Sequence, residues 1–131
     1  VGKNSREWIY VQDHCEALLT IFLKGKIGES YNVGSNQNIT NINIAKKLLY
    51  IAKNEFSILN SKSLIKFVKD RPGHDFRYAL DNKKIFKNLK WKAKVTLYKG
   101  LSQTFNWYIN NKAFFNSISK KKYMNRLGLK K

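Results

Sequence analysis

The chain has 131 residues, of which 43% are hydrophobic, so it can bury a core and has the length of one domain. It contains no run of about 18 apolar residues, which argues against a membrane-spanning helix and a membrane partner. The single cysteine, Cys15, excludes an internal disulfide and favours a reducing, cytoplasmic compartment. The sequence starts at Val1 without an initiator methionine or a signal peptide, so we expect it to be a segment of a longer protein.

The net charge of +18 raises the question of nucleic-acid binding, because basic patches attract phosphate backbones. Only four of the 26 basic residues are arginines, and the lysines are spread from Lys3 to Lys131. A nucleic-acid site is expected to cluster its basic residues and to contain more arginine. We therefore interpret the charge as a solvated surface and expect no nucleic-acid partner.

The first third of the chain predicts a strand, a helix and a second strand. The β-rich run 8–11 predicts a short strand. Asp13 and Glu16 have the spacing of a capping box, which predicts a helix that starts at Asp13 and ends at Gly25. We expect Asp13 to be a structural cap. The buried face of this helix is expected to consist of Ala17, Leu18, Ile21 and Phe22. The second strand is expected at 30–33.

The rest of the chain predicts further elements with short connections. In order, these are an extended piece at 39–42, a helix capped by Asn43 that runs to about Asn54, a strand at 64–68, an extended piece at 77–80, a helix capped by Asp81, and a long helix capped by Thr96 that passes Asn111. Strands and helices alternate along most of the chain, which indicates a mixed α/β fold.

Residues 69–75 hold the only proline, Pro72, next to Gly73. Proline fixes φ and glycine permits positive φ, so this pair predicts a turn. The turn would present Arg71 and His74, whose N–H groups suit phosphate oxygens. Two interpretations remain open from these residues alone: an anion site for a phosphorylated ligand, and a surface turn that carries charges.

The sequence shows no recognisable catalytic, cofactor-binding or metal-binding motif. No glycine-rich turn of the dinucleotide-binding type is present, and Cys15, His14 and His74 are too few and too scattered to predict a metal site. No set of nucleophile, base and acid is visible either. We therefore expect this chain to contribute ligand-binding residues and no catalytic residues.

Several segments, read together, carry a family resemblance. Four segments resemble motifs of the nucleotide-sugar short-chain dehydrogenases: the run Arg6-Glu7-Trp8-Ile9-Tyr10-Val11-Gln12-Asp13-His14, the run from Gly25 to Gly34, the run from Asp70 to Asp81, and the pair Trp107-Tyr108. In this order the set is most similar to the dTDP-glucose 4,6-dehydratases. The resemblance covers essentially all of 1–131 and corresponds to the C-terminal portion of the family. One departure is Lys90-Trp91-Lys92-Ala93, where the family usually has Gly-Trp-Lys-Pro.

The resemblance implies an α/β extended short-chain dehydrogenase in which this segment forms part of the substrate pocket. NAD and the acid–base residues would belong to an N-terminal portion outside this chain, so the segment alone is expected to be inactive. The implied reaction converts dTDP-glucose to the 4-keto-6-deoxy sugar nucleotide with loss of water. The full-length protein is expected to be a cytoplasmic homodimer.

The resemblance also implies contacts with the dTDP-sugar and no catalytic, cofactor or metal residue in this chain. Arg6 and Arg71 match arginines that contact the nucleotide and the diphosphate. The other implied contacts are Asn41, Asp70, Pro72, Gly73, His74 and Tyr123. Two alternatives stay open: another sugar-nucleotide epimerase, decarboxylase or dehydratase, and, with less support, a basic nucleic-acid-binding module.

Overall fold

The computed structural model describes residues 2–57, 65–68, 70 and 72–118. Arg71 and Tyr123, two of the predicted ligand contacts, therefore lie outside the described residues. The described chain contains helices and a two-stranded sheet, which confirms the mixed α/β class. No helix within it is long and apolar enough to span a membrane.

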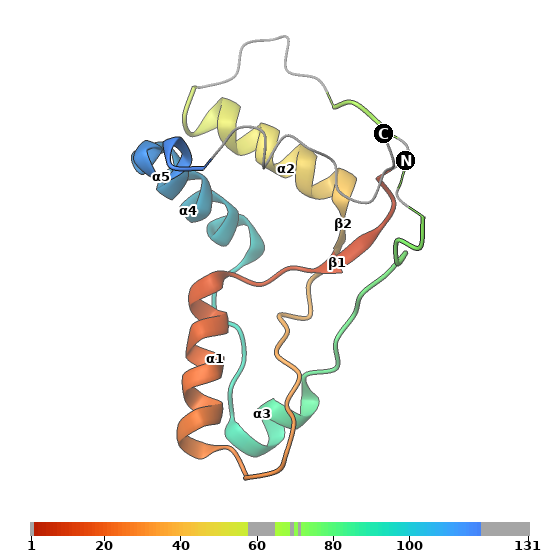
Figure 1. Ribbon diagram of the computed structural model, residues 1–131, viewed down its shortest axis with the longest axis vertical. Helices are drawn as coiled ribbons and strands as arrows, with labels where there is room; N and C mark the ends of the chain where they lie inside the picture. Colours follow the sequence, from red (N-terminus) through yellow and green to blue (C-terminus); the bar gives the residue numbers. More distant parts are fainter. Residues whose placement is uncertain (1, 58–64, 69, 71, 119–131) are drawn as a thin grey trace.

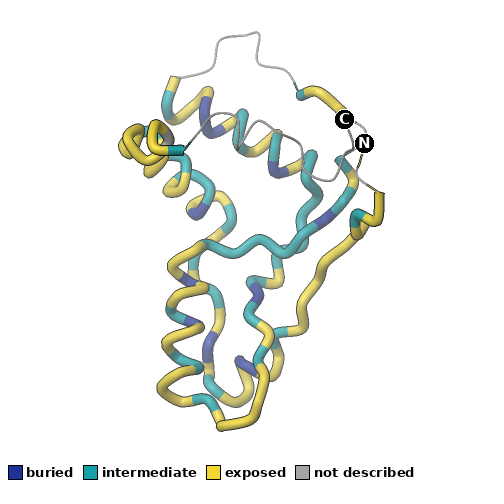
Figure 2. The backbone as a smooth tube through the Cα atoms, in the orientation of Figure 1, coloured by how far each residue is buried: buried dark blue, intermediate teal, exposed yellow. Residues whose placement is uncertain are grey.

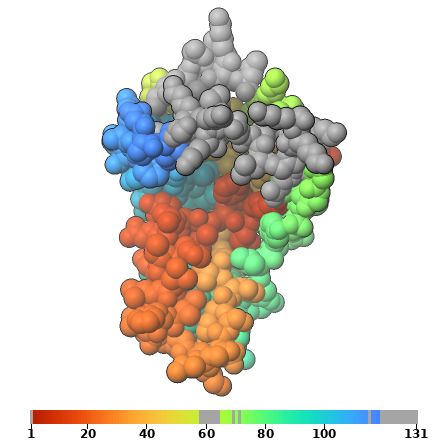
Figure 3. Space-filling model, viewed as in Figure 1, coloured from red at the N-terminus to blue at the C-terminus, as the bar shows by residue number. Residues whose placement is uncertain are grey.

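One end of the molecule is built from α1 (Val11–Lys24) and α3 (Lys83–Leu89), which lie beside each other (Figure 1). Ala17 on α1 and Ile85 on α3 are fully buried, and Trp91 is 6% exposed. We call this group the α1–α3 core. The partly buried apolar residues that pack against it are Ile9, Ile21, Tyr31, Val33, Leu89 and Ala93. Figure 3 shows α1 and the segment after it covering this end on the viewed face.

The other end contains the sheet and the remaining helices. β1 (Ser5–Glu7) pairs antiparallel with β2 (Asn38–Thr40), and α2 (Asn41–Asn54) follows β2 directly. α4 (Leu97–Asn110) packs against α2, and α5 (Lys112–Asn116) comes last. The connection between β1 and α1 joins the two ends (Figure 1).

The predicted strands were wrong in three places. The first strand is β1, which precedes the predicted 8–11, and residue 11 already begins α1. Residues 30–33 and 65–68 form no strand in the part of the chain that the structure describes. A strand needs a neighbour to pair with, and here β1 and β2 are paired only with each other within their sheet. The apolar pattern therefore predicted extended backbone but not its partner.

Asp13 is a structural residue, as expected, but it does not cap α1. The helix begins two residues earlier, after Tyr10. Asp13 is 2% exposed, and its Oδ2 accepts hydrogen bonds from the backbone N–H groups of Lys94 (3.1 Å) and Val95 (2.9 Å). These two donors satisfy the buried carboxylate, which in turn fixes the chain that leads into α4. This partner lies 81 residues away, so no local motif indicates it.

The predicted buried face of α1 was only half right. Ala17 is buried, but Leu18 and Phe22 are 53% and 84% exposed. Figure 2 shows the outward side of α1 exposed along most of its length. The helix turns Asp13 and Ala17, four residues apart, toward the interior instead.

Helix ends were predicted better than helix starts. Gly25 follows the end of α1 and Asn54 ends α2, as predicted. Thr96 caps α4, and its hydroxyl accepts a hydrogen bond from the Lys99 N–H (3.4 Å). One start was shifted: α2 begins at Asn41 rather than after Asn43. Asn82 directly precedes α3 but makes no capping hydrogen bond with its side chain, whereas the predicted cap, Asp81, accepts a hydrogen bond at Oδ1 from the Lys83 N–H (2.9 Å), the first of the helix. The last long helix was predicted to pass Asn111, but α4 ends at Asn110 and α5 is separate.

Candidate functional site

The segment that follows Gly73 runs beside β1. The Ser5 N–H donates to the Phe76 carbonyl (2.9 Å), and the Tyr78 N–H donates to the Ser5 carbonyl (3.1 Å). Ser5 and Arg77 form an isolated parallel bridge. These backbone contacts bring Arg6 next to a loop almost seventy residues away in the sequence.

The predicted turn at Pro72-Gly73 is present. Gly73 has φ +68°, in the left-handed region that other residues rarely adopt. A Cβ at Gly73 would meet no atom within 4 Å, so the backbone conformation, and not space, is the reason for glycine here. The turn delivers His74 and Asp75 to the side of β1.

The Arg6 guanidinium is held by four different groups. Its Nη2 lies 2.7 Å from His74 Nε2 and donates to the Asp75 carbonyl at 2.8 Å. Its Nη1 donates to the Ser5 carbonyl at 2.7 Å. The guanidinium also lies over the Tyr78 ring, 4.7 Å from the centroid, in a cation–π contact.

His74 connects Arg6 to Asp70. Its Nδ1 lies 2.6 Å from Asp70 Oδ1, and the two side chains are 21% and 50% exposed. The Tyr78 hydroxyl donates to the Asp75 carboxylate, which fixes the ring beneath Arg6. We call these five residues, Arg6, Asp70, His74, Asp75 and Tyr78, the Arg6–His74 cluster.

A cavity of about 230 Å³ adjoins the Arg6–His74 cluster. Its lining includes Asn41 at the start of α2, together with Asp70 and His74. Its other lining residues are Gly2, Asn4, Ile42, Ala45, Ile65, Lys66, Phe67 and Val68. The structure thus brings Asn41, Asp70 and His74 to one cavity, while Arg6 contacts His74 without lining it. The cavity combines amide and ionisable groups with an apolar wall, which suits a ligand with polar and apolar parts.

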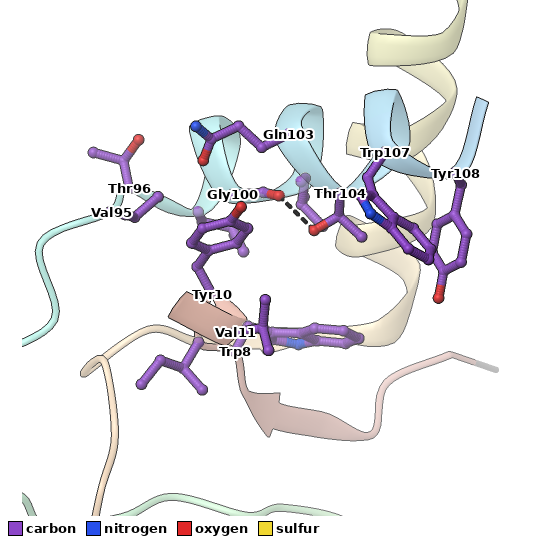
Figure 4. Close-up of a pocket in the computed structure, with 13 residues that line it drawn as sticks. Trp8, Tyr10, Val11, Val95, Thr96, Gly100, Gln103, Thr104, Trp107 and Tyr108 are labelled. Carbon is purple, nitrogen blue, oxygen red and sulfur yellow. Dashed lines mark hydrogen bonds between the residues drawn. The ribbon is translucent and has the colours of Figure 1, made fainter. Parts of the chain in front are cut away.

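A larger cavity, of about 510 Å³, lies between α4 and the β1–α1 connection (Figure 4). Its lining includes Trp8, Tyr10, Trp107 and Tyr108 but no charged residue among those described. The Tyr10 ring points toward Gly100, where an added Cβ would lie 3.1 Å from the Tyr10 Cβ. An anionic ligand finds no countercharge here, so the smaller cavity is the better candidate site despite its size.

The sequence indicated only part of the Arg6–His74 cluster. Arg6, Asp70 and His74 were predicted as ligand contacts, whereas Asp75 and Tyr78 were not. Tyr78 lies in the run from Asp70 to Asp81, and its place in this run of the family resemblance could have indicated it. Asp75 holds Arg6 through a backbone carbonyl, which no side-chain pattern indicates. Among the described residues, no group of three or more His, Cys, Asp or Glu residues is placed to hold a metal ion.

Comparison with known protein families gives one match that covers most of the chain. The sequence model of the family described as GDP-mannose 4,6 dehydratase matches residues 1–104. A dTDP-glucose 4,6-dehydratase from Escherichia coli is 40% identical over 134 aligned residues, which include 98% of this chain. The chain spans 37% of the length of that relative.

Solved structures give the same relationship. A dTDP-glucose 4,6-dehydratase from Bacillus anthracis, in complex with NAD, superimposes with a TM-score of 0.79 at 33% identity. The match covers 90% of this chain and 35% of that one. A UDP-glucose 4-epimerase from Thermotoga maritima, with UDP-glucose, superimposes with a TM-score of 0.73 at 27% identity. That match covers 83% of this chain and 33% of the epimerase.

Proposed function

Because the chain belongs to the GDP-mannose 4,6-dehydratase family, we propose that it is the substrate-binding, C-terminal portion of an NAD-dependent dTDP-glucose 4,6-dehydratase. The similarity to the Escherichia coli enzyme, at 40% identity, supports dTDP-glucose over other sugar nucleotides. The observation that carries the proposal is the meeting of Arg6 with the Asp70–His74 loop beside a cavity. These residues come from the motifs that resemble the dTDP-glucose enzymes.

NAD belongs, in this proposal, to a part of the full-length protein outside the chain. The sequence has no glycine-rich turn between a strand and a helix, so its residues do not fit a dinucleotide. NAD bound there would supply reversible hydride transfer with the sugar. The residues of this chain would bind and orient the sugar nucleotide during that reaction.

The proposed contacts divide the ligand between charged and polar residues. Arg6 and Arg71 would hold the nucleotide diphosphate, because charge-assisted contacts to phosphate are about twice as strong as neutral hydrogen bonds. Asn41 lines the cavity at the start of α2, where its amide can donate to and accept from the ligand. The contact of Tyr123 with the nucleotide, the homodimer and the cytoplasmic location stay predictions.

The proposal is tested with the full-length protein and three candidate substrates. We expect dTDP-glucose to yield the 4-keto-6-deoxy product, detected by mass spectrometry through the loss of one water. GDP-mannose is included because the family model bears its name, and UDP-glucose because of the structural likeness to the Thermotoga epimerase. Turnover of either one without turnover of dTDP-glucose would replace the proposed function by that of another sugar-nucleotide enzyme.

Arg71 gives a prediction about binding. Changing Arg71→Ala is expected to weaken dTDP binding by about 2–4 kcal/mol, because a charge-assisted contact to the diphosphate is lost. Isothermal titration calorimetry measures the change. The matched control is Lys87→Ala, which removes an exposed cation on α3 and is expected to leave the affinity unchanged. Equal effects of the two changes would show that the turn merely carries surface charge.

A further inference from the structure

The hydrogen bonds of His74 determine which ring nitrogen carries its proton. Arginine can only donate, so the 2.7 Å contact between Arg6 Nη2 and His74 Nε2 requires a lone pair on Nε2. The carboxylate of Asp70 can only accept when ionised, so the 2.6 Å contact with His74 Nδ1 places the proton on Nδ1. Together the two neighbours select one state, the neutral imidazole with its hydrogen on Nδ1.

In this state His74 has no N–H group left for an anionic ligand. Its single N–H bond is used by Asp70, and its single lone pair is used by Arg6. Asp70 lines the cavity with a carboxylate, which when ionised has no hydrogen to donate to a phosphate oxygen. The two residues are therefore poorly suited to bind a diphosphate directly.

Arg6, by contrast, retains donors. Three of its five N–H bonds point to described partners: His74, the Asp75 carbonyl and the Ser5 carbonyl. The Tyr78 ring supports one face of the guanidinium. The remaining N–H bonds are held in a preset direction, and preorganised donors bind an anion with a smaller loss of conformational entropy.

We propose that Asp70 and His74 are positioning residues that act through Arg6: Asp70 fixes the tautomer of His74, and His74 orients the Arg6 guanidinium toward a nucleoside diphosphate. The three side chains form a hydrogen-bonded series, Asp70–His74–Arg6, in which each side chain orients the next. This inference rests on the proposed function only for the identity of the ligand.

A double-mutant cycle in the full-length protein tests whether His74 acts through Arg6, with dTDP as the calorimetric probe. Arg6→Ala is expected to weaken dTDP binding by about a hundredfold and His74→Ala by about tenfold. Because His74 acts through Arg6, adding His74→Ala to Arg6→Ala should cause no further loss. A full tenfold loss in both backgrounds would mean that His74 contacts the ligand itself, and would overturn the proposal.

Conservative changes separate orientation from simple packing. In His74→Gln the amide oxygen can replace Nε2 as the acceptor for Arg6, whereas the shorter side chain of His74→Asn can reach only toward Asp70. We expect Gln to keep dTDP affinity near that of the wild type and Asn to lose as much as Ala. The matched control is His14→Ala, which removes the other, exposed histidine of this chain and should change nothing. The reverse order of Gln and Asn would overturn the proposal.

The tautomer itself is measured in the wild-type protein. Imidazole ¹⁵N shifts of the full-length protein, assigned by the signal that disappears in His74→Gln, should report a proton on Nδ1 of His74. A proton on Nε2 would contradict the chain of contacts. If the wild-type protein binds no dTDP while His74 has the expected tautomer, the proposed function fails and the positioning geometry stands.

Discussion

Around Ile85 the chain is stabilised by apolar side chains, whereas around Arg6 it is stabilised by polar contacts. Ala17 and Ile85 are fully buried in the α1–α3 core. In the Arg6–His74 cluster, His74 and Asp70 remain 21% and 50% exposed. Apolar burial is insensitive to direction, while hydrogen bonds set the direction of a donor. The two regions therefore differ in what their contacts do: the apolar contacts of the first stabilise the fold, and the hydrogen bonds of the second fix the direction of the Arg6 guanidinium.

The largest expected effect separates the two regions by stability. Ile85→Ala leaves a cavity in the α1–α3 core and is expected to lower the free energy of unfolding by about 2–5 kcal/mol. Urea denaturation of the full-length protein measures the loss, and dTDP affinity of the folded protein should not change. Ile27→Ala is the matched control, because Ile27 lies at the same end of the molecule but is 99% exposed. If Ile85→Ala changed the dTDP affinity without lowering the free energy of unfolding, the proposed separation of the two regions would be wrong.

The difference between the two regions also explains what could be predicted from sequence. The helix ends at Gly25 and Asn54 were right because contacts within four residues act there: a Cβ at Gly25 would lie 2.4 Å from the Ile21 carbonyl oxygen, and the Asn54 amide donates to the Tyr50 carbonyl (2.8 Å). Asp13 was assigned to the wrong partner because its acceptor role depends on Lys94 and Val95, which only the folded chain brings near. Apolar patterns likewise missed which side of α1 is buried, since Phe22 fits a buried face but lies 84% exposed.

The candidate site was predictable in its side chains but not in its geometry. The turn at Gly73 follows from two adjacent residues and was predicted correctly. Arg6 and His74 were both named as ligand contacts, yet nothing in the sequence shows that they touch each other. That contact comes from backbone pairing of Ser5 with residues 76–78, a long-range arrangement without a local signal.

Two glycines offer a matched pair, one in each region. Gly73 and Gly28 have φ +68° and +82°, and neither would place a Cβ within 4 Å of another atom. Each change to alanine is therefore expected to cost about 1–2 kcal/mol for the left-handed backbone alone. Thermal unfolding should show similar losses, but only Gly73→Ala should weaken dTDP binding. If Gly28→Ala weakened binding equally, the effect would come from lowered stability and not from the turn.

Lys90 provides a change of opposite sign in the region of the apolar core. It follows α3 with φ +55°, in the left-handed region that favours glycine. Lys90→Gly is expected to raise the free energy of unfolding by about 1 kcal/mol, because glycine adopts this conformation without strain. Lys87→Gly, inside α3, is the control and should lower it by about 1 kcal/mol. Urea denaturation measures both, and a loss in Lys90→Gly would mean that its side chain stabilises the turn.

The smallest expected effect concerns a polar contact outside both regions, between α2 and α4. The Glu55 carboxylate accepts hydrogen bonds from the Ser102 and Tyr98 hydroxyls. The Ser102 contact, followed by the Tyr98 contact, lowers the pKa of Glu55, and the contact with Glu55 raises the pKa of Tyr98 from 10.0 to about 12. A lowered carboxyl pKa stabilises the fold above its ordinary value of 4.5, and this contribution is lost as the pH falls through the folded value.

The raised pKa of the Tyr98 phenol affects stability at the alkaline end of the pH range. The contribution of Tyr98 is complete below pH 10.0 and is lost as the pH rises toward about 12. We therefore expect the melting temperature to decline slightly at both acidic and alkaline pH. Glu55→Gln should reduce both declines. Tyr50→Phe, which keeps a ring beside Tyr98, should leave the decline at acidic pH in place. Because Glu55 and Tyr98 are both exposed, Glu55→Gln should change the melting temperature less than Lys90→Gly does. A larger shift would mean that the α2–α4 contact, rather than the α1–α3 core, limits the stability of the fold.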